Sequence, residues 1–283
     1  MIFTINDGDF VAKIDTVGAQ VVSVKTNGTE RLWQNEDGSW AGHAPVLFPA
    51  CGRTKTTVDG VAYPLPMHGF AKRCEFVGEQ IDAQTARFSL RSDAETKQMY
   101  PFDWLLSLVY RVHDKILEVS VEVKNLGKND MYFSLGGHES YALTGNFADY
   151  ELRFPCEETF ETCLHDNTGM LTGEKLKLAP DGKILPLPYE FMREGTTVIL
   201  HNIRSRSVEL CEKNGATLAC TEFDGFSNLL LWHPDESKMV CIEPWLNLPD
   251  FAANGATELS AKEGFVRLAP DSTRQFVRKI TYM

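Results

Sequence analysis

Two neighbouring stretches of the sequence decide the fold class: Trp104–Tyr110, which reads WLLSLVY, and Ile116–Val123, which reads ILEVSVEV. Both are rich in branched and aromatic residues. From Leu117 to Val123 apolar and polar residues alternate strictly, which is the two-residue period of a half-buried β-strand. Residues 111–115 lie between the two stretches and suit a hairpin connection. The pair therefore predicts two antiparallel strands joined by a hairpin.

Short apolar runs of the same kind recur along the rest of the chain. They span residues 10–14, 19–25, 84–91, 131–135, 207–212, 216–222, 228–232, 239–243 and 273–282. Turn pairs such as Asn27-Gly28 and Asn214-Gly215 separate many of them. A helical pattern is confined to residues 93–99, before Pro101, and the alternation of strands with helices that builds a parallel sheet is missing. We therefore predict an all-β protein, a large antiparallel β-sandwich with few short helices.

The chain shows no sign of a domain boundary. Its 283 residues suggest two domains at roughly 150 residues each, but all-β sandwiches of this length often form one domain. Neither a change in composition nor an internal repeat marks a linker, and the proline-rich stretch at residues 180–188 is typical of a surface loop. We predict a single domain over residues 1–283.

Composition and charge narrow the class of partner. Hydrophobic residues make up 43% of the chain, which is ordinary for a globular protein and excludes a largely disordered one. The net charge of −11 disfavours nucleic acid and anionic membrane surfaces as partners. The first ten residues lack the pattern of a signal peptide, and no stretch approaches the roughly 20 apolar residues of a membrane helix. These features predict a cytoplasmic protein with no membrane partner.

The seven cysteines indicate a reduced protein without a metal or redox motif. They stand at positions 51, 74, 156, 163, 211, 220 and 241, and no two of them form a Cys-x-x-Cys pair. Most lie beside apolar residues and are typical of small buried hydrophobic side chains. A phosphate-binding loop and a dinucleotide fingerprint are also missing. We expect no disulfide, no metal and no other cofactor.

Three short segments place titratable residues in apolar or glycine-rich surroundings. They are residues 49–70, 136–141 and 240–245. His68 precedes a glycine that lets the backbone turn sharply, and two glycines before His138 let the backbone approach a ligand. Glu243 follows an apolar run and precedes Pro244-Trp245, so burial would raise its pKa. Each of these three residues also has an ordinary structural interpretation as a hydrogen-bonded or solvated side chain.

Taken together, these segments hold the groups that sugar chemistry uses at neutral pH. Two histidines and a carboxylate can give and take protons. The tryptophans Trp232 and Trp245 offer flat apolar faces on which a sugar ring can lie, and Arg53 adds a cation that on its own would suggest only a solvated loop. The inventory points to a small-molecule sugar as the partner.

At these residues the sequence resembles the aldose 1-epimerase (galactose mutarotase) superfamily, and within it the LacX-like branch. The resemblance covers nearly the whole chain in order. It is carried by Ala19–Ser23, Leu32-Trp33, Pro45–Pro49, His68–Ala71, Gly137-His138, Ser205–Val208 and Cys241–Trp245. The string Cys-Ile-Glu-Pro-Trp and the string His-Gly-Phe-Ala are specific when they occur together at this spacing.

The resemblance implies a fold, a reaction and a set of roles. The family fold is a large antiparallel β-sandwich, and the family reaction interconverts the α and β anomers of a free aldose without a cofactor. By resemblance, Glu243 is the general base on the anomeric hydroxyl and His138 the general acid on the ring oxygen. His68 assists on the ring-oxygen side, Arg53 orients sugar hydroxyls, and Glu194 is the candidate for a further acidic residue that binds hydroxyls.

The chain departs from the family pattern beside His138. Where the family often has His-Pro-x-Phe, this chain has His138-Glu139-Ser140-Tyr141. We expect the acidic neighbour, Glu139, to raise the pKa of His138 or to contact the sugar.

Two alternatives to an aldose 1-epimerase stay open. The first is a hexose-6-phosphate mutarotase, in which Lys55, Lys72 and Arg73 would supply cations for the phosphate. The second is a non-catalytic sugar-binding or regulatory module on the same fold. Retention of His68, His138 and Glu243 disfavours the second alternative, because binding alone needs no acid–base pair.

Overall fold

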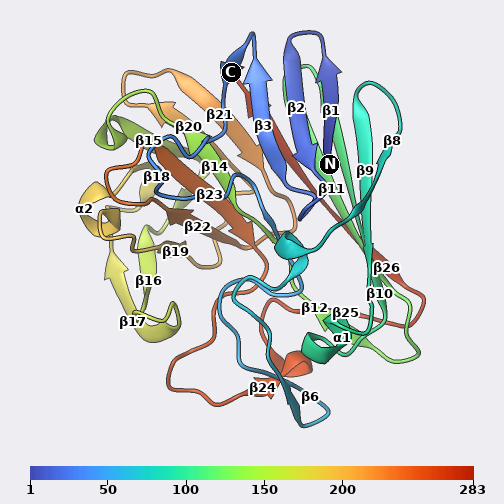
Figure 1. The fold of residues 1–283 in the computed structure, drawn as a ribbon. Helices are drawn as coiled ribbons and strands as arrows, with labels where there is room; N and C mark the ends of the chain where they lie inside the picture. Colours follow the sequence, from blue (N-terminus) through green and yellow to red (C-terminus); the bar gives the residue numbers. More distant parts are fainter.

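The computed structural model describes residues 1–283, and antiparallel strands dominate it (Figure 1). The strands form five sheets, and the only parallel pair of strands joins β24 (Thr257–Glu258) to β6 (Thr56–Val58). The predicted all-β sandwich is confirmed.

A nine-stranded sheet forms one layer. In spatial order it contains β18 (Gly182–Pro186), β15 (Tyr150–Glu158), β20 (Ser207–Glu212), β21 (Thr217–Glu222), β26 (Thr273–Tyr282), β11 (Ile116–Asn125), β10 (Trp104–His113), β9 (Thr85–Arg91) and β8 (Val77–Gln80). Burial alternates along β10 and β11 with a period of two, as the sequence predicted. One face of this sheet therefore packs inward.

An eight-stranded sheet and a four-stranded sheet oppose it. The eight-stranded sheet contains β17 (Leu171–Lys177), β16 (Glu161–His165), β19 (Val198–Leu200), β22 (Asn228–Trp232), β23 (Met239–Trp245), β13 (Gly136–Gly137) and β5 (Val46–Leu47), and β14 (Glu139–Ala142) also pairs with β23. The four-stranded sheet contains β1 (Ile2–Asp7), β2 (Phe10–Asp15), β3 (Val21–Thr26) and β4 (Thr29–Glu30). The core lies between these layers, with 59 buried side chains in one cluster that includes Leu108 and Val121 from one layer and Leu231 and Ile242 from the other.

Short elements close the lower end of the molecule in Figure 1. Strand β7 (Val61–Tyr63) pairs with β6, and β12 (Met131–Phe133) pairs with β25 (Val266–Leu268).

The helices of the whole molecule are short. They are α1 (Thr96–Met99), α2 (Tyr189–Met192) and the 3₁₀ turns η1 (Ala71–Arg73), η2 (Phe147–Asp149) and η3 (Leu259–Ala261). None of these helices has the length and apolar character that crossing a membrane requires.

Two local expectations need correction. The connection between β10 and β11 is not the five residues 111–115, because both strands continue to a two-residue turn at Asp114-Lys115, where φ is 50° and 63°. Residues 180–188 are not simply a loop, since they contain β18 at the edge of the nine-stranded sheet. An edge strand tolerates prolines because only one side of it pairs.

Candidate active site

Strand β23 carries Glu243 into a cleft because its side chains alternate between two buried faces. Val240 and Ile242 pack in the main core. Cys241, Glu243 and Trp245 point to the opposite side of the sheet. Since both faces are covered, the whole strand is buried, and Glu243 is only 1% exposed. A carboxylate in such a strand needs either a partner or a proton.

The cleft on this face of the sheet has a volume of about 670 Å³, which is in the range of small-ligand pockets. Five of the seven site residues predicted from the sequence line it: His68, His138, Trp232, Glu243 and Trp245. The structure thus brings together side chains from four separate segments of the chain.

His138 and Glu243 form the centre of the site. The Nε2 atom of His138 lies 3.3 Å from Oε2 of Glu243. His138 stands between β13 and β14, both of which pair with β23. The preceding Gly137 leaves room for the buried side chain of Arg278, because a Cβ there would lie 1.8 Å from Nη1 of Arg278 and would displace the guanidinium. The close packing of this backbone against Arg278 fixes the position of the histidine.

Burial changes the charge state of the pair. It raises the pKa of Glu243 well above its ordinary value, with a further increase from the charge of Glu139 and an opposing effect of Lys72. Burial, together with the charge of Lys72, lowers the pKa of His138 to about 3. Both shifts favour the uncharged forms, which are a protonated Glu243 carboxyl group and a neutral His138 imidazole. The pair therefore shares one titratable proton. Transfer of that proton from Glu243 to His138 would create a carboxylate base and an imidazolium acid.

Glu139 does not act on the site as expected. Neighbouring residues on a strand point to opposite faces, and the Glu139 side chain points into the core, where it accepts a hydrogen bond from Nη1 of Arg278. Both side chains of this ion pair are almost completely buried. The expectation that Glu139 raises the pKa of His138 or contacts a sugar is therefore wrong.

His68 is held as a neutral hydrogen-bond donor. Its backbone is left-handed, with φ of 65°, and so is that of Gly69, where a Cβ would lie 2.0 Å from the carbonyl oxygen of Phe48. The backbone N–H of Gly52 donates to Nδ1 of His68 at 3.2 Å. Nδ1 is therefore the acceptor, and the ring proton sits on Nε2. Burial also lowers the pKa of His68 well below its ordinary value, which disfavours the imidazolium.

Aromatic rings line the cleft, and one of them, Trp40, was not predicted from the sequence. Trp40 stacks on the ring of His138, with centroids 4.9 Å apart and planes inclined by 22°, and meets Trp232 edge-on at 5.6 Å. Trp245 contacts His68 edge-on at 5.2 Å. Trp40 belongs to a loop whose sequence gives only a turn signal, Asp37-Gly38, so nothing local connects it to His138.

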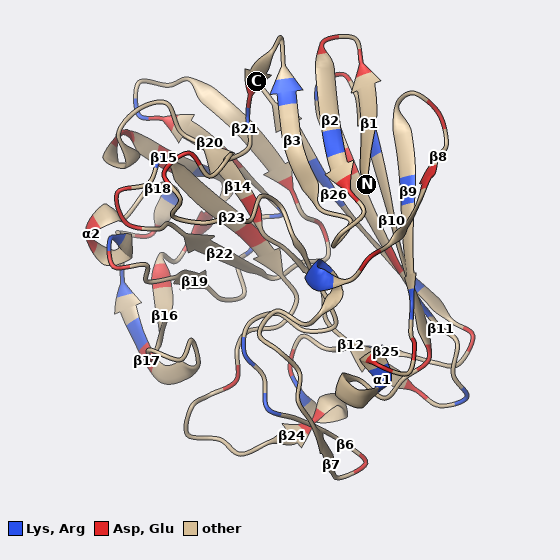
Figure 2. Ribbon diagram, viewed as in Figure 1, with Lys and Arg blue, Asp and Glu red and all other residues tan.

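The remaining charged candidates are three cations and Glu194, and only some of them line the cleft. Lys72 and Arg73 line the cleft and lie on η1, the blue turn near the centre of Figure 2. Arg53 is exposed outside the lining, where its Nε donates to the carbonyl of Thr168 at 2.8 Å. Glu194 is exposed in the loop after α2. The structure does not bring Arg53 or Glu194 into the cleft.

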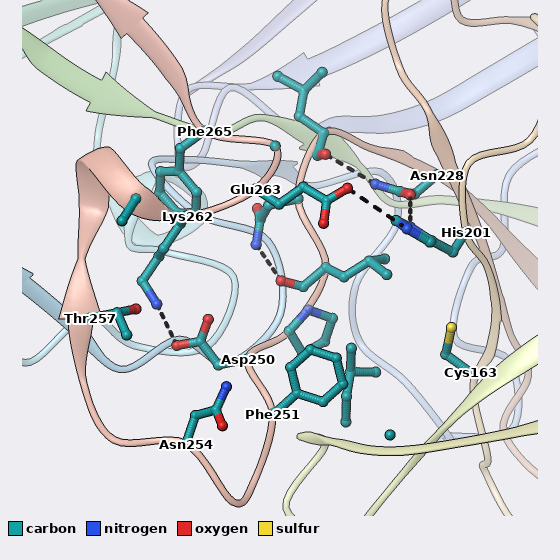
Figure 3. Close-up of a pocket in the computed structure, with 18 of the residues that line it drawn as sticks. Cys163, His201, Asn228, Asp250, Phe251, Asn254, Thr257, Lys262, Glu263 and Phe265 are labelled. Atoms are coloured by element: carbon teal, nitrogen blue, oxygen red, sulfur yellow. Dashed lines mark hydrogen bonds and ion pairs between the residues drawn. The ribbon is translucent and has the colours of Figure 1, made fainter.

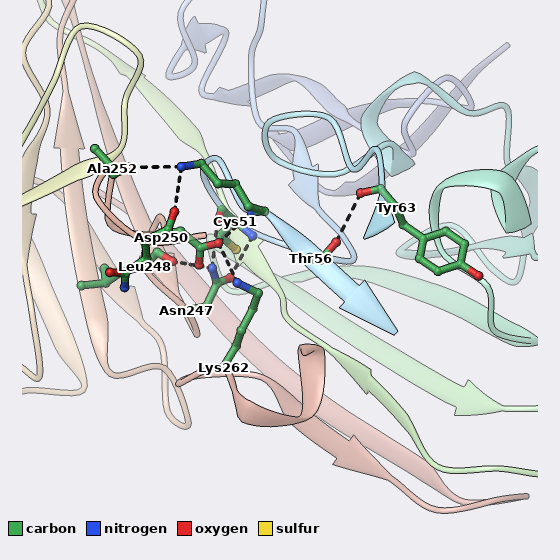
Figure 4. A network of polar contacts seen from close by, with 10 residues as sticks. Cys51, Thr56, Tyr63, Asn247, Leu248, Asp250, Ala252 and Lys262 are labelled. Carbon is green, nitrogen blue, oxygen red and sulfur yellow. Dashed lines mark hydrogen bonds and ion pairs between the residues drawn. The ribbon is translucent and has the colours of Figure 1, made fainter. Parts of the chain in front are cut away.

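A polar network fixes the segment that follows Trp245 (Figure 4). The side-chain oxygen of Asn247 accepts from the N–H of Cys51, and its amide donates to the carbonyl of Cys51, both at 2.9 Å. Oδ2 of Asp250 accepts from the N–H of Lys55 and from Nζ of Lys262. The Lys55 ammonium donates to the carbonyls of Ala252 and Asn254, so this lysine does not serve the cleft as a phosphate cation.

The same segment separates the cleft from a second cavity. This cavity, of about 420 Å³, is shown in Figure 3, and Pro249 lines both. Its polar groups are largely paired with one another: Lys262 with Asp250, and His201 with Asn228 and Glu263. Such internal pairing is typical of a structural role.

One cluster has the composition of a metal site. A ring nitrogen of His138, Sγ of Cys241 and a carboxylate oxygen of Glu243 all lie within 4.8 Å of one another. The sequence spacing gave no sign of it, because His138 lies on a different segment from the other two residues.

The seven cysteines are free thiols in the structure.

The fold and the site define a class of protein: a β-sandwich with a buried histidine–carboxylate pair in a tryptophan-walled cleft. Residues 1–249 match the sequence profile of the aldose 1-epimerase family, and the chain belongs to that family. The resemblance inferred from the sequence is thereby confirmed.

Particular relatives place the chain close to the LacX proteins. The plasmid and chromosomal LacX proteins of Lactococcus lactis subsp. lactis are each 29% identical over 255 residues, which cover 82% of this chain and 83% of theirs. A galactose mutarotase-like protein from Lactobacillus casei ATCC 334 superposes with a TM-score of 0.91 at 25% identity, with all of both chains covered. A galactose 1-epimerase from Lactobacillus acidophilus NCFM shares the fold, with a TM-score of 0.72 at 14% identity over all of this chain and 94% of that one.

Proposed function

We propose that this protein is an aldose 1-epimerase-like isomerase that interconverts the α and β anomers of a hexose. The observation that carries the proposal is the pair of His138 and Glu243, 3.3 Å apart in a cleft between tryptophan rings. An acid and a base this close can act on two neighbouring oxygens of one sugar, the anomeric hydroxyl and the ring oxygen. Membership of the aldose 1-epimerase family supports the same reaction.

In this mechanism the pair moves protons without a net exchange with solvent. The Glu243 carboxylate removes the proton of the anomeric hydroxyl while the His138 imidazolium protonates the ring oxygen. The bond between the anomeric carbon and the ring oxygen breaks, and the anomeric carbon becomes an aldehyde. After the aldehyde rotates, the two transfers run in reverse and close the ring on the other face. Each proton transfer contributes roughly 10²–10⁴-fold to the rate.

The other lining residues position the sugar. The Nε2–H of His68 donates a hydrogen bond to the bound sugar on the side of its ring oxygen. Nε2 is the donor because Nδ1 already accepts a hydrogen bond from the backbone N–H of Gly52. Trp232 and Trp245 supply apolar faces for the ring, and Trp40 keeps the His138 imidazole in orientation by stacking on it. A sugar bound here would exclude water from the pair and strengthen its electrostatic interactions.

Polarimetry on freshly dissolved aldoses tests the proposal. We expect the protein to accelerate the approach of at least one pure anomer of a hexose to its equilibrium rotation. If a sugar binds, by calorimetry, but its mutarotation keeps the uncatalysed rate, the protein is instead a non-catalytic sugar-binding module on this fold.

A phosphorylated hexose is a second candidate substrate, supported by the two cations in the cleft lining. Lys72 and Arg73 lie next to each other on η1, and burial together with Arg73 lowers the pKa of Lys72. A phosphate near them would offset both the desolvation and the mutual repulsion.

Replacement of Lys72 by Met discriminates between the two substrates. If the phosphate binds there, the ratio of kcat/KM for hexose 6-phosphate to that for hexose falls at least roughly tenfold, the equivalent of one charge-assisted hydrogen bond. Lys25→Met, at an exposed position on β3, is the matched control. An unchanged ratio in Lys72→Met assigns the cleft to unphosphorylated sugars.

We expect chelators not to reduce the activity, since proton transfer between oxygens and the His138–Glu243 pair needs no Lewis acid. The check is mutarotation after prolonged dialysis against EDTA. Loss of activity that a divalent ion restores would contradict this mechanism.

We also propose a cytoplasmic location, supported by the seven free cysteines. Thiols that stay unpaired are typical of proteins in a reducing compartment.

A further inference from the structure

The Cys241 thiol lies beside the acid–base pair, and the proposed reaction leaves it unused. It lies two residues before Glu243 on β23, so both side chains point to the same face of the strand. In the sheet register Cys241 is opposite Trp232, and Glu243 is opposite Leu230. Because His138 approaches from between β13 and β14, the thiol, the imidazole and the carboxylate meet at one point, all within 4.8 Å.

These three groups have the donor types and nearly the separations of a tetrahedral metal site. Ligands that bind zinc at about 2.0–2.3 Å stand roughly 3.3–3.7 Å apart on a tetrahedron. The 3.3 Å between Nε2 of His138 and Oε2 of Glu243 already equals one such edge. Sγ of Cys241 lies within 4.8 Å of a ligand atom of each of the other two residues, and it would supply the third ligand of the face. The fourth position would open into the cleft, where water or a sugar hydroxyl can occupy it.

We propose that His138, Cys241 and Glu243 bind a thiophilic divalent cation of the Zn²⁺ type, and that this cation inhibits the enzyme. A thiolate with an imidazole selects Zn²⁺ and its soft neighbours, whereas Mg²⁺ and Ca²⁺ require sets of oxygen ligands. On binding, the cation replaces the proton of the Cys241 thiol and the proton shared by His138 and Glu243, and both protons pass to solvent.

The cation inhibits because it occupies the lone pairs with which Glu243 and His138 exchange protons. The inhibition, unlike the binding, rests on the proposed function. With the cation bound, Glu243 cannot accept the hydroxyl proton and His138 has no proton to give to the ring oxygen. The cation and the sugar would also compete for the same position in the cleft. Binding of the cation, in contrast, does not depend on any activity and can be measured alone.

The binding experiment uses the full protein after removal of metals, titrated with Co²⁺ as a spectroscopic probe and with Zn²⁺ in a calorimeter. We expect a near-ultraviolet charge-transfer band between thiolate and Co²⁺, and one Zn²⁺ site per chain. Cys241→Ala and Cys241→Ser should abolish the band and weaken Zn²⁺ binding by more than the roughly 10–100-fold that the loss of an outer-shell partner costs. Cys156→Ser, a half-buried cysteine outside the cluster, is the control and should keep both signals.

The activity experiment measures mutarotation with Zn²⁺ or Mg²⁺, each variant relative to its own uninhibited rate. We expect Zn²⁺ to raise the apparent KM of the unmodified protein, Mg²⁺ to have no effect, and Cys241→Ala to need at least tenfold more Zn²⁺ for the same inhibition. Absence of the charge-transfer band, or equal Zn²⁺ binding by both Cys241 variants and the control, overturns the site. A Cys241-dependent band in a protein without mutarotase activity supports the site and refutes the proposed function instead.

Discussion

Replacement of Glu243 by Gln is expected to lower kcat for mutarotation by roughly 10²–10⁴-fold while sugar binding persists. Glutamine keeps the size and the hydrogen-bonding oxygen of the side chain but has no basic carboxylate. Because Glu243 is buried, the amide also occupies the same volume without admitting water. The measurement is polarimetry for the rate and calorimetry for binding of the same sugar. His138→Asn should lower kcat to a similar extent, through loss of the proton for the ring oxygen.

The double variant distinguishes a concerted pair from two independent groups. If His138 and Glu243 act together, Glu243→Gln/His138→Asn should be hardly slower than either single variant. Glu79→Gln, an exposed glutamate on β8, controls for the loss of a carboxylate and should keep the full rate. Full activity of Glu243→Gln would rule out the carboxylate as the base.

The second large effect concerns the ion pair behind the site. Arg278→Met is expected to lower the free energy of unfolding by about 3–5 kcal/mol, the usual cost of breaking a buried pair. The change leaves the Glu139 carboxylate in the core without a partner, and the side chains of both residues are no more than 4% exposed. It also removes the guanidinium on which Gly137 packs, so the segment that carries His138 loses its support.

Urea unfolding measures this effect. Arg278→Met/Glu139→Leu should recover much of the lost stability, because it leaves no uncompensated charge in the core. Arg87→Met is the control, since Arg87 and Glu79 form an exposed pair whose loss should cost at most about 1 kcal/mol. If the unfolding midpoints of Arg278→Met and Arg87→Met coincide, the buried pair does not stabilise the fold.

The fold was predictable because strand signals are local. The alternation in residues 117–123 needs no knowledge of the rest of the chain, and the structure shows it as alternating burial along β11. Residues 180–188 were misjudged because an edge strand pairs on one side only and tolerates prolines. The pattern of β18 therefore resembles that of a loop.

The candidate site was predictable only in part, because its contacts join distant segments. Burial of Glu243 followed from the apolar run around it. The direction of Glu139 did not, since its partner Arg278 lies 139 residues further along the chain. Trp40 reaches His138 from a loop without a motif, and Cys241 gains its neighbour His138 only when β13 and β14 pair with β23. These residues are defined by tertiary packing rather than by spacing.

Exchange between the anomeric protons of a hexose at equilibrium is the most direct test of the proposed reaction, because it needs no net conversion. Nuclear magnetic resonance would record saturation transfer from the α to the β signal with the unmodified protein and with Glu243→Gln at equal concentration. The mechanism predicts accelerated transfer with the unmodified protein and, with Glu243→Gln, a rate close to that of buffer. Transfer at the buffer rate for every hexose and hexose phosphate that the unmodified protein binds would contradict it.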